Sequence, residues 1–222
     1  MRWRRLPRPA FQMASDCDRT HVDLIRHGEH LLADAICGIT DPDLSTRGWQ
    51  QLESQCKRLI DQGESWDICI SSPRIRCAHF AEQLCQQLAL ELIVEDGFAE
   101  VDFGRWEGLS FAELNRSCPG EWQNWIDNPA HPPLHGGEGQ SEFLHRIQQS
   151  WNALFGRYQG KRILLFSHGG VIRAIFADIF GLDARALLRF NVPHACHSRI
   201  IAYHMANKPN WFQLDSHNSL LQ

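Results

Sequence analysis

The apolar run KRILLFS at residues 161–167 is the feature that most limits the folds open to this chain. A continuous run of this kind is typical of a strand buried on both faces of a parallel sheet. Shorter apolar runs predict further strands at residues 21–25, 66–72 and 91–96. Helical periodicity fills the intervals, at residues 45–63, 73–88, 141–160 and 169–181. This alternation predicts an α/β fold, a three-layer α/β/α sandwich around a mostly parallel central sheet.

Three segments depart from the alternation. The Trp-, Pro- and Gly-rich stretch at 101–140 predicts one or two short helices. We expect these helices to form an insert that covers the active site. Residues 198–205 and 211–217 predict a closing hairpin or an edge pair of strands. Residues 1–20 predict a disordered tail, and residues 21–222 a single domain.

The tail carries four arginines but no apolar run of a signal peptide. We favour a disordered tail, or an upstream start codon with true initiation at Met13. An arm that binds nucleic acid or membrane is less favoured, because four positive charges make a weak patch. The net charge of −4 gives no general basis for nucleic-acid binding. No apolar stretch approaches the ~20 residues of a membrane helix, so no membrane partner is expected.

The eight cysteines are scattered and form no C-x-x-C pair. This spacing predicts reduced thiols in a cytoplasmic protein rather than a disulfide framework or a structural zinc site.

Two of the predicted strands end in His-Gly, which places His27 and His168 at one edge of the sheet. In LIRHGEH, a zinc site is disfavoured because His27 and His30 are three residues apart rather than four. Gly28 disfavours a helix there, and the cation Arg26 is a poor neighbour for a metal ion. No metal and no cofactor are expected.

A phosphate site fits these residue types better. Arg26 can bind phosphate oxygens in a bidentate manner, and Arg74 follows a third strand, at 66–72. A histidine with an unprotonated ring nitrogen can attack phosphorus and form a phosphohistidine. Glu100 and Glu107 are candidate proton donors for the leaving oxygen, because a nearby anionic phosphate favours a protonated carboxyl.

Four motifs, LIRHGE, SSPRIRCAHFAEQL, EVDFGRWEG and LLFSHGGVIRAI, resemble in order and spacing those of the histidine phosphatase superfamily, over residues 21–205. The resemblance implies a metal-independent phosphoric monoester hydrolase with a small-molecule phosphate monoester as its partner. By position it implies His27 as nucleophile, with Arg26, Arg74 and His168 around the phosphate and Glu100 as general acid. It also implies a structural role for Glu107.

Further residues follow from the same resemblance. Cys37, Gly38 and Gly169 are predicted to contact the substrate, and Arg76 is taken as an ordinary solvated helix residue. The family usually has Thr where this chain has His30, and often Asn where it has Ala33. These departures remove one usual phosphate contact, and no role is assigned to His30.

The insert bears on the substrate. Its stretch from 111 to 140 contains only Arg116 as a cation, which disfavours a bisphosphorylated acid. GGEGQSEFLHRI and LLRFNVPHACHSRI resemble the α-ribazole-5′-phosphate phosphatases of cobalamin nucleotide-loop assembly. Trp122 and Trp125 could stack on a benzimidazole nucleoside, although core packing is the commoner role of such a pair.

Other functions stay open. They are a broad-specificity or sugar phosphate phosphatase, a phosphoglycerate mutase-like phosphomutase, and a module that binds phosphorylated ligands without catalysis. The sequence does not determine the oligomeric state.

Overall fold

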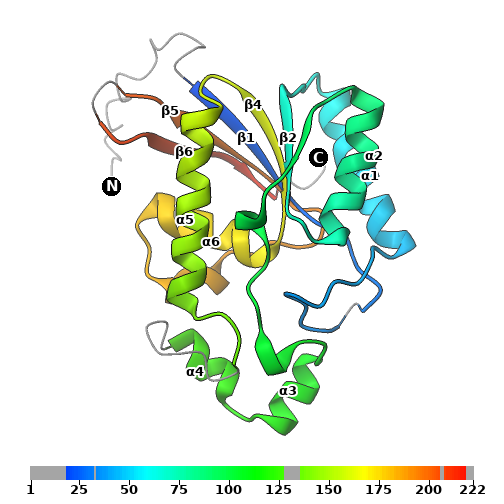
Figure 1. Ribbon diagram of the computed structural model, residues 1–222, viewed down its shortest axis with the longest axis vertical. Coiled ribbons are helices and arrows are strands. Elements are labelled where there is room, and N and C mark those ends of the chain that lie inside the picture. The colour runs from blue at the N-terminus through cyan, green and yellow to red at the C-terminus, as the bar shows by residue number, and fades with distance from the viewer. Residues whose placement is uncertain (1–18, 33, 128–135, 206–207, 219–222) are drawn as a thin grey trace, which may run out of the picture.

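A six-stranded sheet organises the computed structural model, which describes residues 19–32, 34–127, 136–205 and 208–218 (Figure 1). The strands are β1 (Arg19–Arg26), β2 (Ile68–Ser71), β3 (Leu92–Val94), β4 (Arg162–Ser167), β5 (His197–Tyr203) and β6 (Trp211–His217). Their order is β3-β2-β4-β1-β5-β6. The first four are parallel, whereas β5 runs antiparallel to both β1 and β6. The mostly parallel sheet and the closing hairpin are thus confirmed.

The predicted strand ends differ from the observed ones by at most two residues, and the start of β1 bears on the predicted tail. Arg19 and Thr20, assigned to the tail, are the first two residues of β1 and pair with β5. The predicted tail therefore extends two residues too far.

Two pairs of helices cover the sheet (Figure 1). Helices α1 (Thr46–Asp61) and α2 (Ile75–Leu88) pack on one face, and α5 (Gln140–Arg157) and α6 (Gly169–Phe180) on the other. Strand β4 explains the apolar run, because Leu164 and Phe166 face α1 and α2 whereas Ile163 and Leu165 face α5 and α6. The α/β/α sandwich is confirmed.

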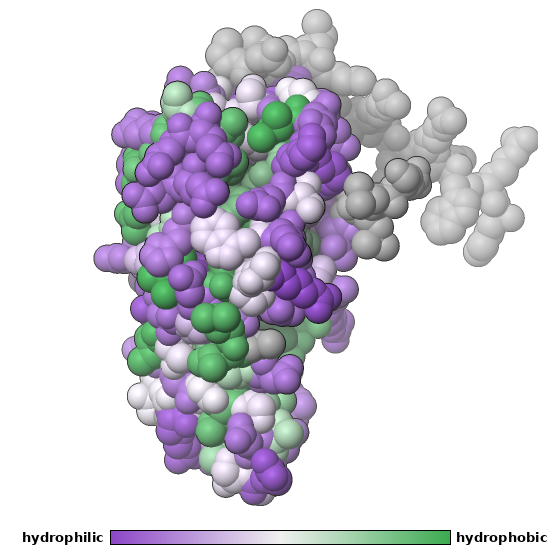
Figure 2. Space-filling view, turned by 90° about the vertical axis from the view of Figure 1, so that its right-hand side faces the viewer, coloured by the Kyte–Doolittle hydropathy of each residue, from purple (hydrophilic) through white to green (hydrophobic). Residues whose placement is uncertain are grey.

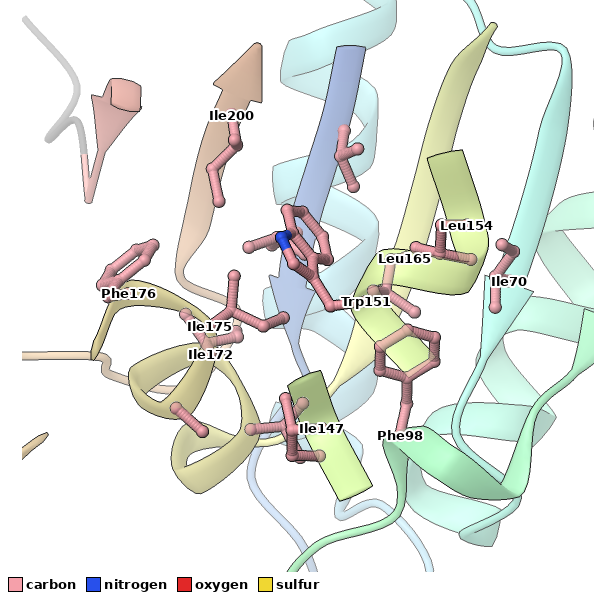
Figure 3. Packing of buried hydrophobic residues seen from close by; sticks show 14 of the residues in the cluster. Ile70, Phe98, Ile147, Trp151, Leu154, Leu165, Ile172, Ile175, Phe176 and Ile200 are labelled. Atoms are coloured by element: carbon pink, nitrogen blue, oxygen red, sulfur yellow. The ribbon is translucent and has the colours of Figure 1, made fainter. Parts of the chain in front are cut away.

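Trp151 of α5 lies at the centre of the larger core (Figure 3). Its buried indole packs among strand residues such as Leu165 and Ile200 and the α6 residues Ile172 and Ile175. This packing fixes α6 on the sheet, and so fixes the position of the helix start that follows β4.

The outer surface of the α1–α2 layer, unlike the buried core, is largely polar (Figure 2). Figure 2 shows this face of the molecule as mainly hydrophilic, with hydrophobic side chains in small separate groups. Among the described residues, no helix is both long enough and apolar enough to cross a membrane.

The insert between β3 and α5 lies beyond the carboxyl ends of the strands (Figure 1). It contains short 3-10 helices at Asp96–Phe98 and Gly104–Trp106, then α3 (Phe111–Ser117) and α4 (Glu121–Asp127). A capping box starts α3, in which Ser110 accepts from the backbone N–H of Glu113 and the Glu113 side chain accepts from Ser110. The prediction of one or two short helices here is confirmed.

A buried carboxylate ties β1 to β5. Asp23 is 1% exposed and accepts hydrogen bonds from Trp66 Nε1 at 2.7 Å and from Arg199 Nε at 2.8 Å. Oδ1 of Asp23 also lies 2.7 Å from His197 Nε2, and Oδ2 accepts a second hydrogen bond from Arg199 Nη2 at 3.0 Å. Burial alone would raise the pKa of Asp23, but the hydrogen bonds with His197 and Arg199 outweigh it and lower the pKa to about 2.

We expect Asp23→Asn to reduce the free energy of unfolding by about 1–3 kcal/mol, because it removes one of the two carboxylates, Asp23 and Glu64, that pair with the Arg199 guanidinium. The depressed pKa stabilises the wild type above the unfolded pKa of 3.8, and this contribution disappears as the pH falls through about 2. Urea unfolding of the wild type and Asp23→Asn at a series of pH values between about 2 and 7 tests this prediction. The difference between wild type and variant must shrink toward low pH, and a constant difference would contradict the assignment.

Candidate active site

The pairing of β1 with β4 brings two histidines together. In the parallel register Arg26 lies opposite Ser167, so His27 and His168 leave the sheet side by side. Their ring centroids are 5.2 Å apart, with the planes at 60°. The prediction that His27 and His168 lie at one edge of the sheet is confirmed.

His27 is buried and held in one tautomer. Its Nδ1 lies 2.7 Å from the carbonyl oxygen of Gly28, and because a carbonyl can only accept, Nδ1 carries the proton. Burial and the charges of Arg26 and Arg76 hold the pKa of His27 well below its usual value. The ring is therefore neutral, with a lone pair on Nε2.

His168 is fully buried at the N-cap of α6. Its Nε2 lies 2.7 Å from Ser72 Oγ, an oxygen that also accepts the backbone N–H of Arg74 at 3.3 Å. Ser72 is thus placed to donate its own proton to His168 Nε2, which leaves the ring proton on Nδ1. Burial, followed by the charge of Arg76, keeps the pKa of His168 well below its usual value.

Arg26 projects into the site from the last residue of β1. Its Nη1 donates to the carbonyl oxygen of Val192 at 2.7 Å, while its buried Nε has no hydrogen-bond partner among the described residues. Burial lowers the pKa of Arg26 to about 10, and the group still carries a positive charge near neutral pH.

Arg76, rather than Arg74, is the buried arginine of α2. Its side chain is 0% exposed, so the prediction of a solvated residue is wrong. It donates to the carbonyl oxygens of Cys37, Gly38 and Thr40 and pairs with Asp41 at 3.1 Å.

The charge of Arg76 lowers the pKa of His27, and it lowers the pKa of His168 more strongly than Arg74 does. Arg74 is the half-buried N-cap of α2 and does not line the cavity described below. The helical pattern contained this signal, because Arg76 shares a face with the buried residues Cys77, Phe80 and Leu84.

Glu100 reaches the site from the segment after β3. One carboxyl oxygen accepts from the backbone N–H of Val101 at 3.1 Å and the other from Gly170 at 3.0 Å. A Cβ at position 170 would lie 2.2 Å from Glu100 Oε1, so a larger residue there would displace the Glu100 carboxyl group. The start of α6 and Glu100 therefore position each other.

Glu107, the other candidate acid, points elsewhere. Its carboxylate accepts backbone N–H groups from Gly38, Ile39, Thr40 and Phe103 at 2.9–3.0 Å. Burial would raise its pKa, but the bonds from Thr40, Phe103 and Gly38 outweigh it and lower the pKa. This geometry matches the structural role predicted for Glu107.

Glu29 and Gly28 fix the turn after β1. Glu29 Oε1 accepts from the hydroxyl of Ser45, the N-cap of α1, at 2.9 Å. Gly28 packs so closely on Gly48 that a Cβ would lie 2.2 Å from the Gly48 carbonyl oxygen. The turn that carries His27 is thus fastened to α1.

These residues surround a cavity of about 320 Å³. Its polar side is formed by Arg26, His27, His30, Cys37, Glu100, Gly169, Gly170 and Arg173. Its apolar side is formed mainly by Ile36, Phe103, Phe111, Trp122, Trp125, Phe143, Leu187 and Leu188. Of the residues predicted to contact the substrate, Cys37 and Gly169 line the cavity and Gly38 does not. Burial raises the pKa of the Cys37 thiol.

Sequence reasoning missed three residues around the cavity. Arg173 of α6 lines it and donates from Nε to the carbonyl oxygen of Phe190 at 3.0 Å. Its position four residues after Gly169 is a helical-face signal that could have revealed it. The His194 ring lies 5.6 Å from that of His27, and His30 lies at 5.8 Å. His194 belongs to a connecting loop, where no periodicity points to it.

Residues 22–213 match the histidine phosphatase superfamily (branch 1). The chain belongs to this family. It is a phosphatase of that superfamily.

Individual relatives are distant. Phosphoserine phosphatase 1 of Hydrogenobacter thermophilus is 28% identical over 173 residues, 78% of this chain and 80% of that protein. The adenosylcobalamin/alpha-ribazole phosphatase of Escherichia coli is 30% identical over 183 residues, 80% of this chain and 87% of that protein. A bifunctional protein of Mycobacterium tuberculosis is 33% identical over 176 residues, and this chain spans 48% of its length.

A solved structure of a putative alpha-ribazole-5′-P phosphatase from Escherichia coli is 27% identical, with a TM-score of 0.76 over 90% of this chain and 96% of that one. The histidine phosphatase fold of this chain is therefore shared with experimentally determined structures.

In this histidine phosphatase, no group of three or more His, Cys, Asp or Glu residues within the described part of the chain is arranged to hold a metal ion. The arrangement offers a neutral imidazole nitrogen, two buried guanidinium groups and a carboxyl group. These groups suit attack on, and charge stabilisation of, a phosphoryl group.

We expect Arg76→Met to lower kcat/KM for a phosphate monoester by about 100-fold or more, the usual cost of removing a main electrostatic contact. Neither arginine lines the cavity itself, but Arg74→Met, the matched control, should lower it by less than about 10-fold, because Arg74 is only half-buried and its charge lowers the pKa of His168 less than that of Arg76 does. Steady-state kinetics on variants with wild-type melting temperatures checks this. A larger loss for Arg74→Met would restore the original assignment.

Proposed function

We propose that this chain hydrolyses phosphate monoesters through a phosphohistidine at His27. The observation that carries the proposal is the neutral, buried imidazole whose Nδ1–H is held by Gly28, which leaves Nε2 unprotonated beside two guanidinium groups. Such an imidazole is a nucleophile already in its reactive form.

The reaction has two steps. Nε2 of His27 attacks phosphorus, the bond to the ester oxygen breaks, and protonated Glu100 gives its proton to the departing alkoxide. Water then attacks the phosphohistidine while the Glu100 carboxylate accepts its proton, and inorganic phosphate leaves as His27 is restored. Glu100 fits both roles because it lines the same cavity as His27.

The cations stabilise charge on the phosphoryl oxygens during transfer. Arg26 and Arg76 supply fixed charge, and His168 supplies a ring proton on Nδ1, which has no hydrogen-bond partner among the described residues. We assign to Arg76, rather than to Arg74, the role of the second arginine that stabilises the phosphoryl group.

His27→Ala should abolish turnover and labelling of the protein by a ³²P-monoester, because no other residue takes the phosphoryl group in this scheme. His145→Ala, a change at an exposed histidine of α5, is the control and should label like the wild type. An alkaline quench preserves phosphohistidine for the measurement. Labelling of the His27→Ala protein, or activity removed by a chelator, would contradict the scheme.

For the substrate, we infer an ester whose leaving group carries a flat aromatic ring, with α-ribazole 5′-phosphate as the first candidate. Trp122 and Trp125 line the cavity and stack on each other with centroids 5.3 Å apart. Phe111 contacts Trp122 edge-on at 5.2 Å. The similarity to the Escherichia coli adenosylcobalamin/alpha-ribazole phosphatase supports this choice. A role in cobalamin nucleotide-loop assembly follows from it.

A second candidate rests on Arg173. A second cation lining the cavity suits a substrate with a carboxylate besides its phosphate, such as phosphoserine. The similarity to phosphoserine phosphatase 1 of Hydrogenobacter thermophilus is in line with it.

A panel of monoesters separates these candidates. We expect the highest kcat/KM for α-ribazole 5′-phosphate, and Trp122→Ala should raise its KM by about 10-fold, as loss of one stacking partner does. Trp122→Phe, which keeps an aromatic face, should recover most of the loss, and glycerol phosphate should respond to neither change. A preference for phosphoserine that Arg173→Gln removes would favour the second candidate. Isomerisation of 3-phosphoglycerate would indicate a mutase.

A further inference from the structure

His30 is a buried histidine at the cavity to which the reaction scheme gives no task. It is 5% exposed and lines the same cavity as His27 and Glu100. Its backbone forms an isolated antiparallel bridge with Leu44, and the next N–H, of Leu31, donates to Asp43 at 2.9 Å. The ring is thus carried by a fixed segment.

The His30 ring has no hydrogen-bond partner among the residues that the structure describes, and its Nδ1 is enclosed. Buried polar groups nearly always have a partner, because an unpaired one loses its hydration without compensation. Since the ring borders the cavity, a group bound in the cavity is the partner that this position can still gain.

The surroundings of His30 favour an anion as that partner. Burial, then the charges of Arg76 and Arg26, lower the pKa of His30 to about 4, and Glu29 acts weakly in the opposite direction. The neighbouring rings are His27 at 5.8 Å and His194 at 6.2 Å. Near neutral pH His30 is therefore a neutral imidazole with one N–H, next to two guanidinium groups that attract negative charge.

We propose that His30 binds the phosphoryl group of the substrate by donating a ring N–H to one of its non-bridging oxygens. The assignment rests on the proposed phosphatase function, and adds a third kind of contact to those of the arginines and His168. A neutral donor suits this place, because a further positive charge would be repelled by Arg26 and Arg76 in the empty site.

Calorimetric titration with inorganic phosphate tests the proposal without turnover. His30→Leu should weaken phosphate binding by about 10-fold, the usual effect of one hydrogen bond to a charged oxygen. His30→Asn places an amide N–H near the Nδ1 position and His30→Gln near the Nε2 position. One of the two should restore affinity to within about threefold and so identify the donating nitrogen. His145→Leu, at the surface of α5, is the matched control and should bind like wild type.

Unchanged phosphate affinity in His30→Leu would overturn the proposal, even if kcat/KM fell, because the contact would then belong to the leaving group. So would weakened binding that neither amide variant restores, in proteins with wild-type melting temperatures. The proposed function fails separately, if the wild type binds phosphate but hydrolyses no monoester and forms no phosphohistidine.

Discussion

Positive charge buried with little carboxylate nearby is the constraint on which this site depends. Arg26, Arg76 and Arg173 each donate to loop carbonyl oxygens, of Val192, of residues 37–40 and of Phe190 respectively. Carbonyl oxygens satisfy the N–H groups without cancelling the charge. The same bonds hold the loop at 37–40 and the segment with Phe190 and Val192 in place, so the loop positions around the site and its positive potential come from one set of interactions.

The few carboxylates near these cations are already occupied. Asp41 pairs with Arg76, and Glu107 accepts four backbone N–H groups that fasten the loop at 38–40. Glu100 is the one carboxyl residue among the described residues that line the cavity. The proposed phosphate can therefore enter without displacing a salt bridge. Burial, followed by the nearby positive charges, lowers the pKa of His27, His30 and His168 and keeps these rings neutral. The nucleophilic role proposed for His27 depends on this neutrality.

The sequence predicted the sheet well because the relevant signals are local. Ile163 to Phe166 are apolar because both faces of β4 are buried, and the His-Gly ends of β1 and β4 necessarily share an edge. Helical periodicity places Arg76 on the buried face of α2, whereas the position of Arg74 close to the end of β2 is a misleading signal.

The positions of His30 and His194 could not be predicted in this way, unlike that of Arg173, which lies on α6. The positions of His30 and His194 depend on the path of connecting loops. Ala195, which follows His194, adopts a left-handed conformation with φ of 54°, and its N–H donates to the His27 carbonyl oxygen at 3.1 Å. Contacts of this kind join residues far apart in the chain and leave no periodic pattern. Ala33, whose departure from the family pattern was noted, lies outside the described residues.

The insert shows why the catalytic and selective parts of the site can vary separately. Ile36, Trp106 and Leu114 form a small core of their own, apart from the two cores that flank the sheet. Trp122 packs against this core, Trp125 packs against both this core and the larger one beside the sheet, and both side chains line the cavity. Glu121 adds a polar tie, accepting from Trp106 Nε1 at 3.1 Å. Changing the aromatic wall therefore alters the stability of the insert, whereas the histidines and arginines are held by the sheet, α2 and α6 and need not move.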